Sequence, residues 1–476
     1  MNNIKLLLAL LLYVPALCSA QTATENYVKT VTMLDADGTD SLQAVQYYNG
    51  LGYPTLSVAT AGTDGGTACT LTTYDGAGRE KRRYLPVPAN GLEYIPVNGV
   101  TSMGLFYLDN GFFTESHYDA LDRVTAVDIA GDTWRQAGKQ DRTEHLANTL
   151  SDLVLHYEAP EDGSYSLTLP ENTSSFEYYP EGTLAKAVSY DADNRSTAVF
   201  TDLLGRKIME RTAAGDTYYV YNDLGQLRFV LTPAFNKISQ EKTIYAYEYR
   251  YDNRGRVVWK KLPGAECVQY WYDSADRMAY MRDTALGNRY RFCLYDRFGR
   301  LCVQGTCSDG NRDGSVLSAT SYTSGSGGVC STGYSAPYSI SDPQLEIVNY
   351  YDTYEFIGNN LTSAMPALTI GQEQRLHAIG YLTGQVVYAT GGEALGTVTV
   401  YDRKGQAVRC VRKGLGGRLE DVVTAYTFTG AVDSTEGHAG VGDGSDFMAK
   451  TSYTYQYGKK TKMSLSVRHG ASTQSR

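Results

Sequence analysis

Several common signals are scarce in this sequence. Helical periodicity is hard to find, and its best candidate, residues 148–155, is short. The six histidines form no H-E-x-x-H pair, and no G-x-S-x-G or G-x-x-x-x-G-K string occurs. The net charge of −9 and the pI near 5.3 argue against a basic nucleic-acid surface. We therefore expect neither an enzyme nor a nucleic-acid-binding protein.

Tyrosine and glycine dominate instead, with 40 Tyr and 48 Gly against 12 Phe and 3 Trp. Many of them belong to a recurring Y-D-x-x-G-R string. Its full copies are Tyr74–Arg79, Tyr251–Arg256 and Tyr295–Arg300, and looser copies begin at Tyr118, Tyr190, Tyr221, Tyr272 and Tyr401. A repeated unit must bury its apolar face against its neighbours, so the string indicates a repeat architecture.

The string is typical of a hairpin turn. Asp favours the first position of a type I turn, and Gly suits the fourth because it reaches positive φ at no steric cost. The Tyr should end one strand, and the Arg should open the next strand at a water-facing position. Structural turn residues are thus Tyr74, Asp75, Gly78, Tyr251, Asp252, Gly255, Arg256, Tyr295, Asp296, Gly299 and Arg300.

The flanks of the turns alternate with strand period. Tyrosines occupy positions 245, 247, 249 and 251, with Ala246, Glu248 and Arg250 between them. An isolated hairpin is only marginally stable in water, so successive hairpins should add edge to edge. The sequence predicts an all-β fold of tandem hairpins in one long antiparallel sheet.

The first residues have the features of a targeting segment. Lys5 precedes an apolar run over 6–17, and small residues precede Gln21. We assign 1–20 to a signal peptide, with lipidation at Cys18 as an alternative, and we find no later membrane span. Seven cysteines remain in the mature chain. We expect most to be apolar fillers, with a local Cys302–Cys307 bridge as the alternative.

The organisation along the mature chain is uneven. We expect a repeat region over 21–310 with an insertion near 129–169, then a Ser/Gly-rich surface loop over 311–345, and further repeats over 346–476. The turn string is missing after Tyr457, where Gly458 is followed by lysines. We expect the chain to end there as a truncated array with unsatisfied last strands, and to self-associate through that edge.

Three passages resemble the Rhs/YD-repeat family. They are residues 218–228 leading to Leu231-Thr232-Pro233, residues 261–266 before Tyr270–Asp273, and residues 295–301. The resemblance implies a sheet that spirals into a partial hollow shell, here lacking the C-terminal core segment and toxin. It also implies export to the outside or outer surface of a Gram-negative cell and a downstream repeat, core or toxin polypeptide as partner.

One local pattern suggests a cation. Asp309, Asn311, Asp313 and Ser315 follow the opening of a Ca²⁺-binding loop, with Gly314 at its sixth position. Thr320 stands where a bidentate Glu is needed, so the site would be weak, and turn residues in a loop are the simpler interpretation. We expect no other cofactor.

Two functions remain open at this point. The first is a non-catalytic structural shell segment of an exported, toxin-related repeat protein. The alternative is a cell-surface module that binds carbohydrate or protein, because Tyr-rich strands can stack on sugars or meet a partner protein.

Overall fold

The computed structural model describes residues 22, 24–61, 65–102, 106–159, 178–237, 242–309, 316–323, 327–358, 368–389, 392–440, 447–469 and 472–475. The proposed signal peptide 1–20 lies outside these residues. So do Asn311, Asp313 and Ser315 of the proposed Ca²⁺ loop.

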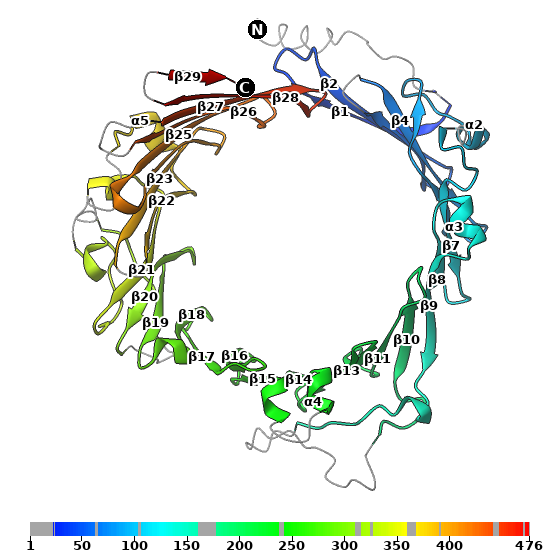
Figure 1. The fold of residues 1–476 in the computed structure, drawn as a ribbon, viewed down its shortest axis with the longest axis horizontal. Coiled ribbons are helices and arrows are strands. Elements are labelled where there is room, and N and C mark those ends of the chain that lie inside the picture. The colour runs from blue at the N-terminus through cyan, green and yellow to red at the C-terminus, as the bar shows by residue number, and fades with distance from the viewer. Residues whose placement is uncertain are drawn as a thin grey trace, which may run out of the picture. The chain divides into compact units, whose positions relative to one another are not determined.

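The described chain is built from β-strands, which confirms the predicted all-β fold (Figure 1). The strands in the first third are β1 (Asn26–Met33), β2 (Ser41–Tyr48), β3 (Pro54–Thr60), β4 (Thr67–Tyr74), β5 (Glu80–Tyr84), β6 (Val87–Ala89), β7 (Phe113–Tyr118), β8 (Val124–Asp128) and β9 (Gln140–Ala147). Short helices α2 (Val97–Ser102) and α3 (Asp132–Gln136) lie between them.

The strands continue through the rest of the chain. They are β10 (Ala185–Tyr190), β11 (Ser196–Thr201), β12 (Lys207–Thr212), β13 (Gly215–Tyr221), β14 (Leu227–Leu231), β15 (Ala246–Tyr251), β16 (Val257–Lys261), β17 (Cys267–Tyr272), β18 (Met278–Arg282), β19 (Tyr290–Tyr295), β20 (Leu301–Cys307), β21 (Gln344–Tyr351), β22 (Leu382–Tyr388), β23 (Ala394–Tyr401), β24 (Ala407–Lys413), β25 (Leu419–Tyr426), β26 (Val432–Gly440), β27 (Phe447–Gln456), β28 (Lys459–His469) and β29 (Ser472–Ser475). Helices α4 (Pro233–Lys237) and α5 (Gln372–Leu376) are each little more than one turn long.

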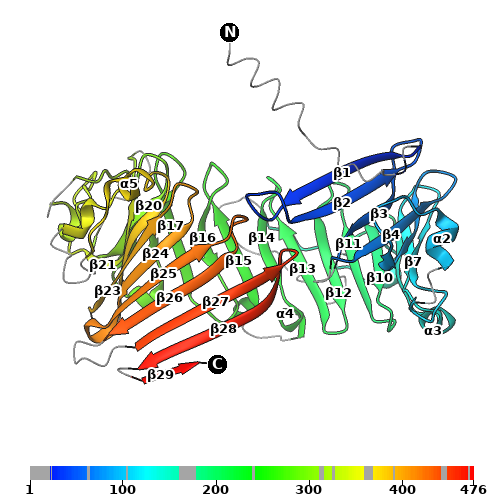
Figure 2. The ribbon, with the colours of Figure 1, turned by 90° about the horizontal axis from the view of Figure 1, so that it is seen from above.

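Each strand pairs antiparallel with the next one along the chain through most of the sheet. Figure 2 shows this order for β23 to β26, which lie side by side. One exception lies near the start, where the first half of β4 pairs with β6 and its second half with β5, which then pairs with β7.

The chain divides into two compact units. Unit 1 comprises residues 1–144, 189–196 and 454–462, and unit 2 comprises residues 145–188, 197–453 and 463–476. The tip of the hairpin formed by β27 and β28 therefore belongs to unit 1, together with the first strands of the chain.

The motif turns share one backbone geometry. At Asp75 the backbone N–H donates to the Arg79 carbonyl at 2.9 Å, and the Gly78 N–H donates to the Asp75 carbonyl at 3.0 Å. The Asp75 carboxylate also accepts from the N–H groups of Ala77 and Arg79, at 2.9 and 3.0 Å. This is a type I turn followed by a glycine bulge, which suits the twist of a hairpin.

The fourth turn residue adopts positive φ in every copy of this geometry. Gly78, Gly255 and Gly299 have φ of 82°, 77° and 81°. Where the sequence lacks glycine there, Asp or Asn takes its place: Asp122, Asn194 and Asp276 have φ of 62°, 60° and 61°. These two residue types tolerate the left-handed region better than other side chains do.

The alternating tyrosines at 245–251 differ in part from expectation. Tyr245 lies in a 3₁₀ turn, and the strand begins at Ala246. The remaining residues of β15 after Ala246 are all half-buried, so both faces of this strand are partly open. A covered strand such as β23 instead alternates half-buried and buried residues, with Val398 and Val400 fully buried.

The main core of unit 2 covers one face of β18 to β23. It contains Phe292, Val303, Val348, Tyr350 and Val386 from the sheet. It also contains residues from the connections between strands, namely Val329, Tyr334, Tyr354, Phe356, Ile370 and Ala378. These connections form a second layer that shields the sheet from water.

The expected surface loop at 311–345 is therefore partly wrong. Tyr334 is buried, and Ser318 and Thr332 are fully buried. The Tyr334 hydroxyl donates to the Asn349 carbonyl at 2.8 Å, and the Ser318 N–H donates to the Asp273 carboxylate at 3.1 Å. Small Ser, Thr and Gly residues let this segment lie close against the strands, and its tyrosines fill the layer.

Unit 1 has its own core under the connection that follows β5. Tyr47, Leu56, Val58 and Leu71 from the sheet pack with residues of the connection, Val87, Val100 and Phe112. Figure 1 shows α2 and α3 on one side of these strands. The buried Tyr47 also has a polar partner, since its hydroxyl donates to the Leu92 carbonyl at 2.7 Å.

Two further expectations concern the end of the chain and the cysteines. Tyr457 and Gly458 form a two-residue turn between β27 and β28, so the segment that lacks the motif string still makes a hairpin. The seven cysteines of the described residues are free, and Cys302 and Cys307 are not bridged. Burial raises the pKa of both thiols to about 11, as expected for apolar fillers.

Backbone strain alone should separate two glycine variants. Gly299 and Gly76 both have open space where a side chain would start, but only Gly299 has positive φ. Gly299→Ala should lower the free energy of unfolding by about 1–2 kcal/mol, whereas Gly76→Ala should be neutral or stabilising by up to about 1 kcal/mol. Urea unfolding of both variants measures this, and equal effects would refute the turn geometry.

Candidate functional site

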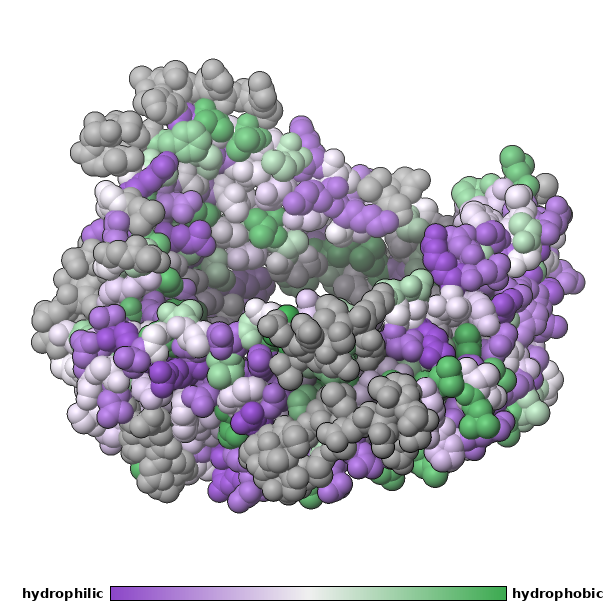
Figure 3. All heavy atoms as spheres, turned by 60° about the horizontal axis from the view of Figure 1, so that its bottom comes forward, coloured by the Kyte–Doolittle hydropathy of each residue, from purple (hydrophilic) through white to green (hydrophobic). Residues whose placement is uncertain are grey.

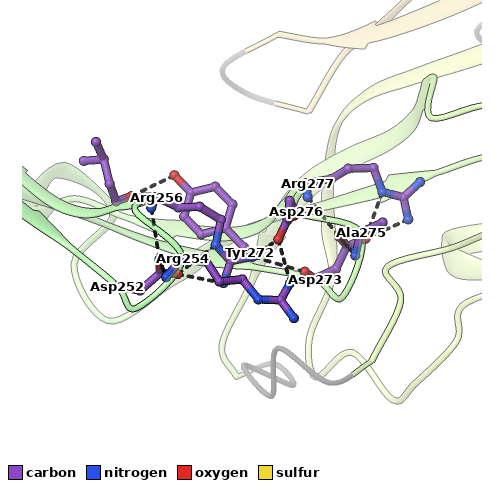
Figure 4. A network of polar contacts seen from close by, with 9 residues as sticks. Asp252, Arg254, Arg256, Tyr272, Asp273, Ala275, Asp276 and Arg277 are labelled. Atoms are coloured by element: carbon purple, nitrogen blue, oxygen red, sulfur yellow. Dashed lines mark hydrogen bonds and ion pairs between the residues drawn. The ribbon is translucent and has the colours of Figure 1, made fainter.

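The motif side chains of neighbouring hairpins bind one another in a repeated arrangement, which we call the turn ladder. Figure 4 shows one rung. The Arg256 guanidinium pairs with its own turn's Asp252 through Nε and Nη2, both at 2.7 Å. Its Nη1 reaches the next turn, where it pairs with Asp276 at 2.6 Å. The same guanidinium lies 4.7 Å from the ring centroid of Tyr272.

The tyrosine completes the rung from the other side. The Tyr272 hydroxyl donates to the carbonyl of Val257, the residue that follows Arg256, at 2.7 Å. The same bond recurs along the sheet from Tyr74 to Pro54, Tyr118 to Glu80, Tyr221 to Lys207, Tyr251 to Leu227, Tyr295 to Met278, Tyr351 to Leu301, Tyr401 to Leu382 and Tyr426 to Ala407. Each rung therefore joins one hairpin to the next.

The arginine contact also recurs. Guanidinium groups lie over the next motif tyrosine at Arg79 and Tyr118, Arg206 and Tyr221, Arg277 and Tyr295, and Arg300 and Tyr351, at 4.3 to 5.1 Å from the ring centroid. In two rungs a tyrosine replaces the arginine. Tyr53 stacks on Tyr74 at 5.2 Å, and Tyr381 stacks on Tyr401 at 4.7 Å.

The ladder corrects the expectation that the motif arginines face water. The Arg256 and Arg277 side chains are only 22% and 19% exposed. Stacking buries the flat guanidinium while its N–H groups stay bonded to carboxylates and turn carbonyls. Arg→Lys is therefore not a mild change here, because an ammonium group lacks the planar, bidentate geometry.

The carboxylates of the ladder are held in the ionised form. Asp273 is the most enclosed, with its side chain 0% exposed. Burial alone would raise the pKa of Asp273, but hydrogen bonds from the Arg277 side chain and backbone, and from the Ser318 N–H, outweigh it and lower the pKa. The pKa of Asp252 is lowered in the same way, mainly by Arg256 against the opposing effect of burial.

The other sequence-derived site residues fall into two groups. Tyr295, Asp296 and Arg300 form a rung in which Arg300 also pairs with Asp352, the residue that follows β21. The Ca²⁺ candidate is different. Asp309 is exposed, and the other three candidate ligands, Asn311, Asp313 and Ser315, lie outside the described residues. Within the described part of the chain, no group of three or more His, Cys, Asp or Glu is placed to hold a metal ion.

Sequence reasoning missed a cavity of about 390 Å³ in unit 2. Its lining includes Tyr157 from the insertion, Tyr179 from the segment that follows it, and Arg206, Tyr219 and Tyr221 from the repeats. Polar groups also line it, from His156, Glu158, Asn222 and Asp223. Aromatic rings beside carboxylate and amide groups can bind a hydroxyl-rich ligand. The insertion carries no periodic signal that would have identified its residues.

Contacts among the lining residues hold His156 and Tyr179 in place on one side of the cavity. The His156 and Tyr179 ring centroids are 4.4 Å apart, and the Tyr179 N–H donates to the Val154 carbonyl at 2.9 Å. Burial raises the pKa of Tyr179 to about 12, so its hydroxyl stays protonated near neutral pH. On the ladder side, Arg206 stacks on Tyr221 and pairs with Asp202.

The surface between these features is mixed. On the face shown in Figure 3, hydrophilic and hydrophobic residues alternate in small groups. Several of the exposed apolar side chains stand at turns, such as Leu203, Leu224 and Phe298. Every helix in the described ranges is too short or too polar to cross a lipid bilayer.

Comparisons with known proteins find one family model and several solved structures. A family model described as a domain of unknown function, DUF6443, matches residues 20–147, which include β1 to β9. No curated protein matches the chain. The crystal structure of TcdB2-TccC3-Cdc42 is similar over 93% of this chain at 13% identity, with a TM-score of 0.46.

A second structure, TcdB2-TccC3-TEV, is similar over 99% of this chain, again at 13% identity and a TM-score of 0.46. This chain spans 22% and 23% of the two matched chains, so it is much shorter than either.

Acid should weaken the buried rung at Asp273. The pKa of Asp273 is lower in the folded protein than in the unfolded chain, where an aspartate has a pKa of about 3.9. The ionised carboxylate therefore stabilises the fold above that pH, and this contribution is lost as the pH falls through the folded pKa. Asp273→Asn should therefore cost about 3 kcal/mol at pH 7, because Arg277 loses its buried partner, and much less at pH 3.

Asp191 provides the control for this prediction. It holds the same turn position, but its side chain is 46% exposed and Arg195 is 78% exposed. Asp191→Asn should change the urea midpoint little at either pH. A cost for Asp273→Asn that is the same at pH 3 and pH 7 would contradict the prediction.

Proposed function

We propose that this chain is a non-catalytic β-scaffold segment of an exported Rhs-type YD-repeat protein. The turn ladder carries the proposal. Asp and Arg are the most frequent reactive residues of the motif. In the turn ladder they are bound to each other and to the neighbouring hairpin. Groups held in this way stabilise a wall and are poorly placed to act on a substrate.

The two-layered construction supports the same role. The connections cover one face of the sheet in each unit, while the ladder secures the turns at the strand ends. A wall of this kind is stiff because its hairpins are fixed by backbone bonds, by tyrosine hydroxyls and, in many rungs, by an ion pair. Stiffness is what a scaffold needs in order to hold or shield another polypeptide.

Export and partnership complete the proposal. The segment 1–20 has the features of a signal peptide, which supports export, and the resemblance to YD-repeat proteins supports secretion or display at the outer surface of a Gram-negative cell. The partner would be a polypeptide with further repeats, a core segment or a toxin. Self-association through free strand edges is the expected behaviour without that partner.

Expression of the full chain in its natural host tests export and partnership together. The mature protein should be recovered outside the cytoplasm with its N-terminus at Gln21, as measured by mass spectrometry. Leu10→Arg, which places a charge in the apolar run, should keep the unprocessed chain inside. A tagged mature chain should co-purify with a repeat-bearing polypeptide.

Two outcomes would contradict this proposal. One is an unprocessed wild-type chain that stays in the cytoplasm. The other is an exported chain that is recovered alone as a stable monomer, because a scaffold segment should hold a partner or a second copy.

The cavity in unit 2 favours a second candidate function, carbohydrate binding at the cell surface. Its tyrosines and carboxylates are the groups that recognise sugars, through ring stacking and hydroxyl hydrogen bonds. A glycan array probed with the mature chain should then give specific binding that Tyr219→Ala removes. Tyr27→Ala, an exposed tyrosine outside the cavity lining, should leave binding unchanged. An array without specific binding would reject this second candidate.

A further inference from the structure

The tip of the β27–β28 hairpin has an unusual residue in its turn. Tyr457 and Gly458 both have positive φ, at 48° and 70°. A two-residue turn of this kind usually takes Asn-Gly, because a bulky side chain is sterically disfavoured in the left-handed region. A tyrosine in this place requires a compensating contact elsewhere.

That contact lies within unit 1. The Tyr457 ring lies directly over the backbone of Gly65, which precedes β4. A side chain beginning at Gly65 would come within 2.6 Å of the Tyr457 Cζ atom and closer still to its hydroxyl oxygen. Only glycine leaves room for the ring, so the two residues fit as a pair.

The ring sits at the wall of a cavity of about 370 Å³. The cavity is lined by Ser41, Gln43, Thr60, Gly65, Thr67, Asn90, Gly91, Leu92, Glu93 and Tyr457. Beside it, the position of a Gly458 side chain would lie 3.4 Å from Leu42 and 3.7 Å from Leu34. Both turn residues thus pack on the first hairpins, and Tyr457 is half-buried although it stands at a hairpin tip.

We propose that the backbone around Gly65 is a docking site for the chain's own β27–β28 tip, with Tyr457 as the anchoring residue beside the cavity. Within unit 1, the docking holds residues 454–462 against the first hairpins, in addition to the turn ladder that joins sequential neighbours. It offsets the backbone strain at Tyr457, because the ring exchanges water for the Gly65 backbone and the cavity wall. The proposal does not depend on the scaffold function.

Two glycine variants of the full mature chain test the docking. Gly65→Ala places a methyl group against the Tyr457 ring. Gly52→Ala is the matched control, because Gly52 also lies in a turn with positive φ, at 81° against 76°, but has nothing within 4 Å. Hydroxyl-radical footprinting read at the Tyr457 peptide should rise severalfold in Gly65→Ala and stay at the wild-type level in Gly52→Ala.

Equal labelling in the wild type and in Gly65→Ala, or an equal rise in both glycine variants, would overturn the proposal. Wild-type labelling that falls as the protein concentration rises would also overturn it, because the occupant would then be the tip of a second copy.

A third variant keeps the test decisive if Gly65→Ala fails to fold. Tyr457→Asn supplies the residue that the turn prefers and removes only the ring, so the hairpin itself should form at least as well. Hydrogen exchange should then speed up severalfold in peptides that cover Gly65–Thr67 and Asn90–Glu93, with an unchanged circular dichroism spectrum. Unchanged exchange in those peptides would refute an anchoring role for Tyr457.

Discussion

The contact between a motif arginine and the tyrosine of the next turn is the interaction on which the rest of the sheet depends. Backbone hydrogen bonds pair strands but do not fix where each turn lies relative to its neighbour. The guanidinium does so, because it bonds its own aspartate and stacks on the next tyrosine, as Arg256 does between Asp252 and Tyr272. The tyrosine hydroxyl returns a bond to the preceding hairpin, so the register is fixed from both sides.

The substitutions along the ladder show which property is essential. Tyr53 and Tyr381 replace arginine and keep the flat stack on the next tyrosine. Asp276 replaces glycine at positive φ and adds an ion pair to Arg256. These substitutions keep the stacking on the next tyrosine and the backbone conformation of the turn, although they change the charge of the side chain. This is why the motif can degrade in sequence without interrupting the sheet.

The ladder and the cavity suggest different kinds of function for the two parts of the repeat. Turn residues are committed to neighbouring hairpins, which fits a wall. Segments between the repeats are free of that constraint, and they supply the buried tyrosine layer around Tyr334 and one side of the aromatic cavity, at Tyr157 and Tyr179. Any ligand specificity of this protein should therefore reside in its insertions, because function is commonly carried by sites added to a repeated fold.

The sequence by itself determined the strands, the turns and the positive φ of residues such as Gly299, because these depend on neighbours a few residues apart. It also indicated that most cysteines are fillers, because no C-x-x-C pair or histidine spacing suggests a metal site. It did not reveal that Arg256 is half-buried, that the segment around Ser318 packs into the core, or that Tyr457 docks at Gly65. Those features depend on which distant backbone lies opposite each side chain. Only the tertiary structure decides that, because many sequence positions offer a tyrosine or an arginine an equally good local environment.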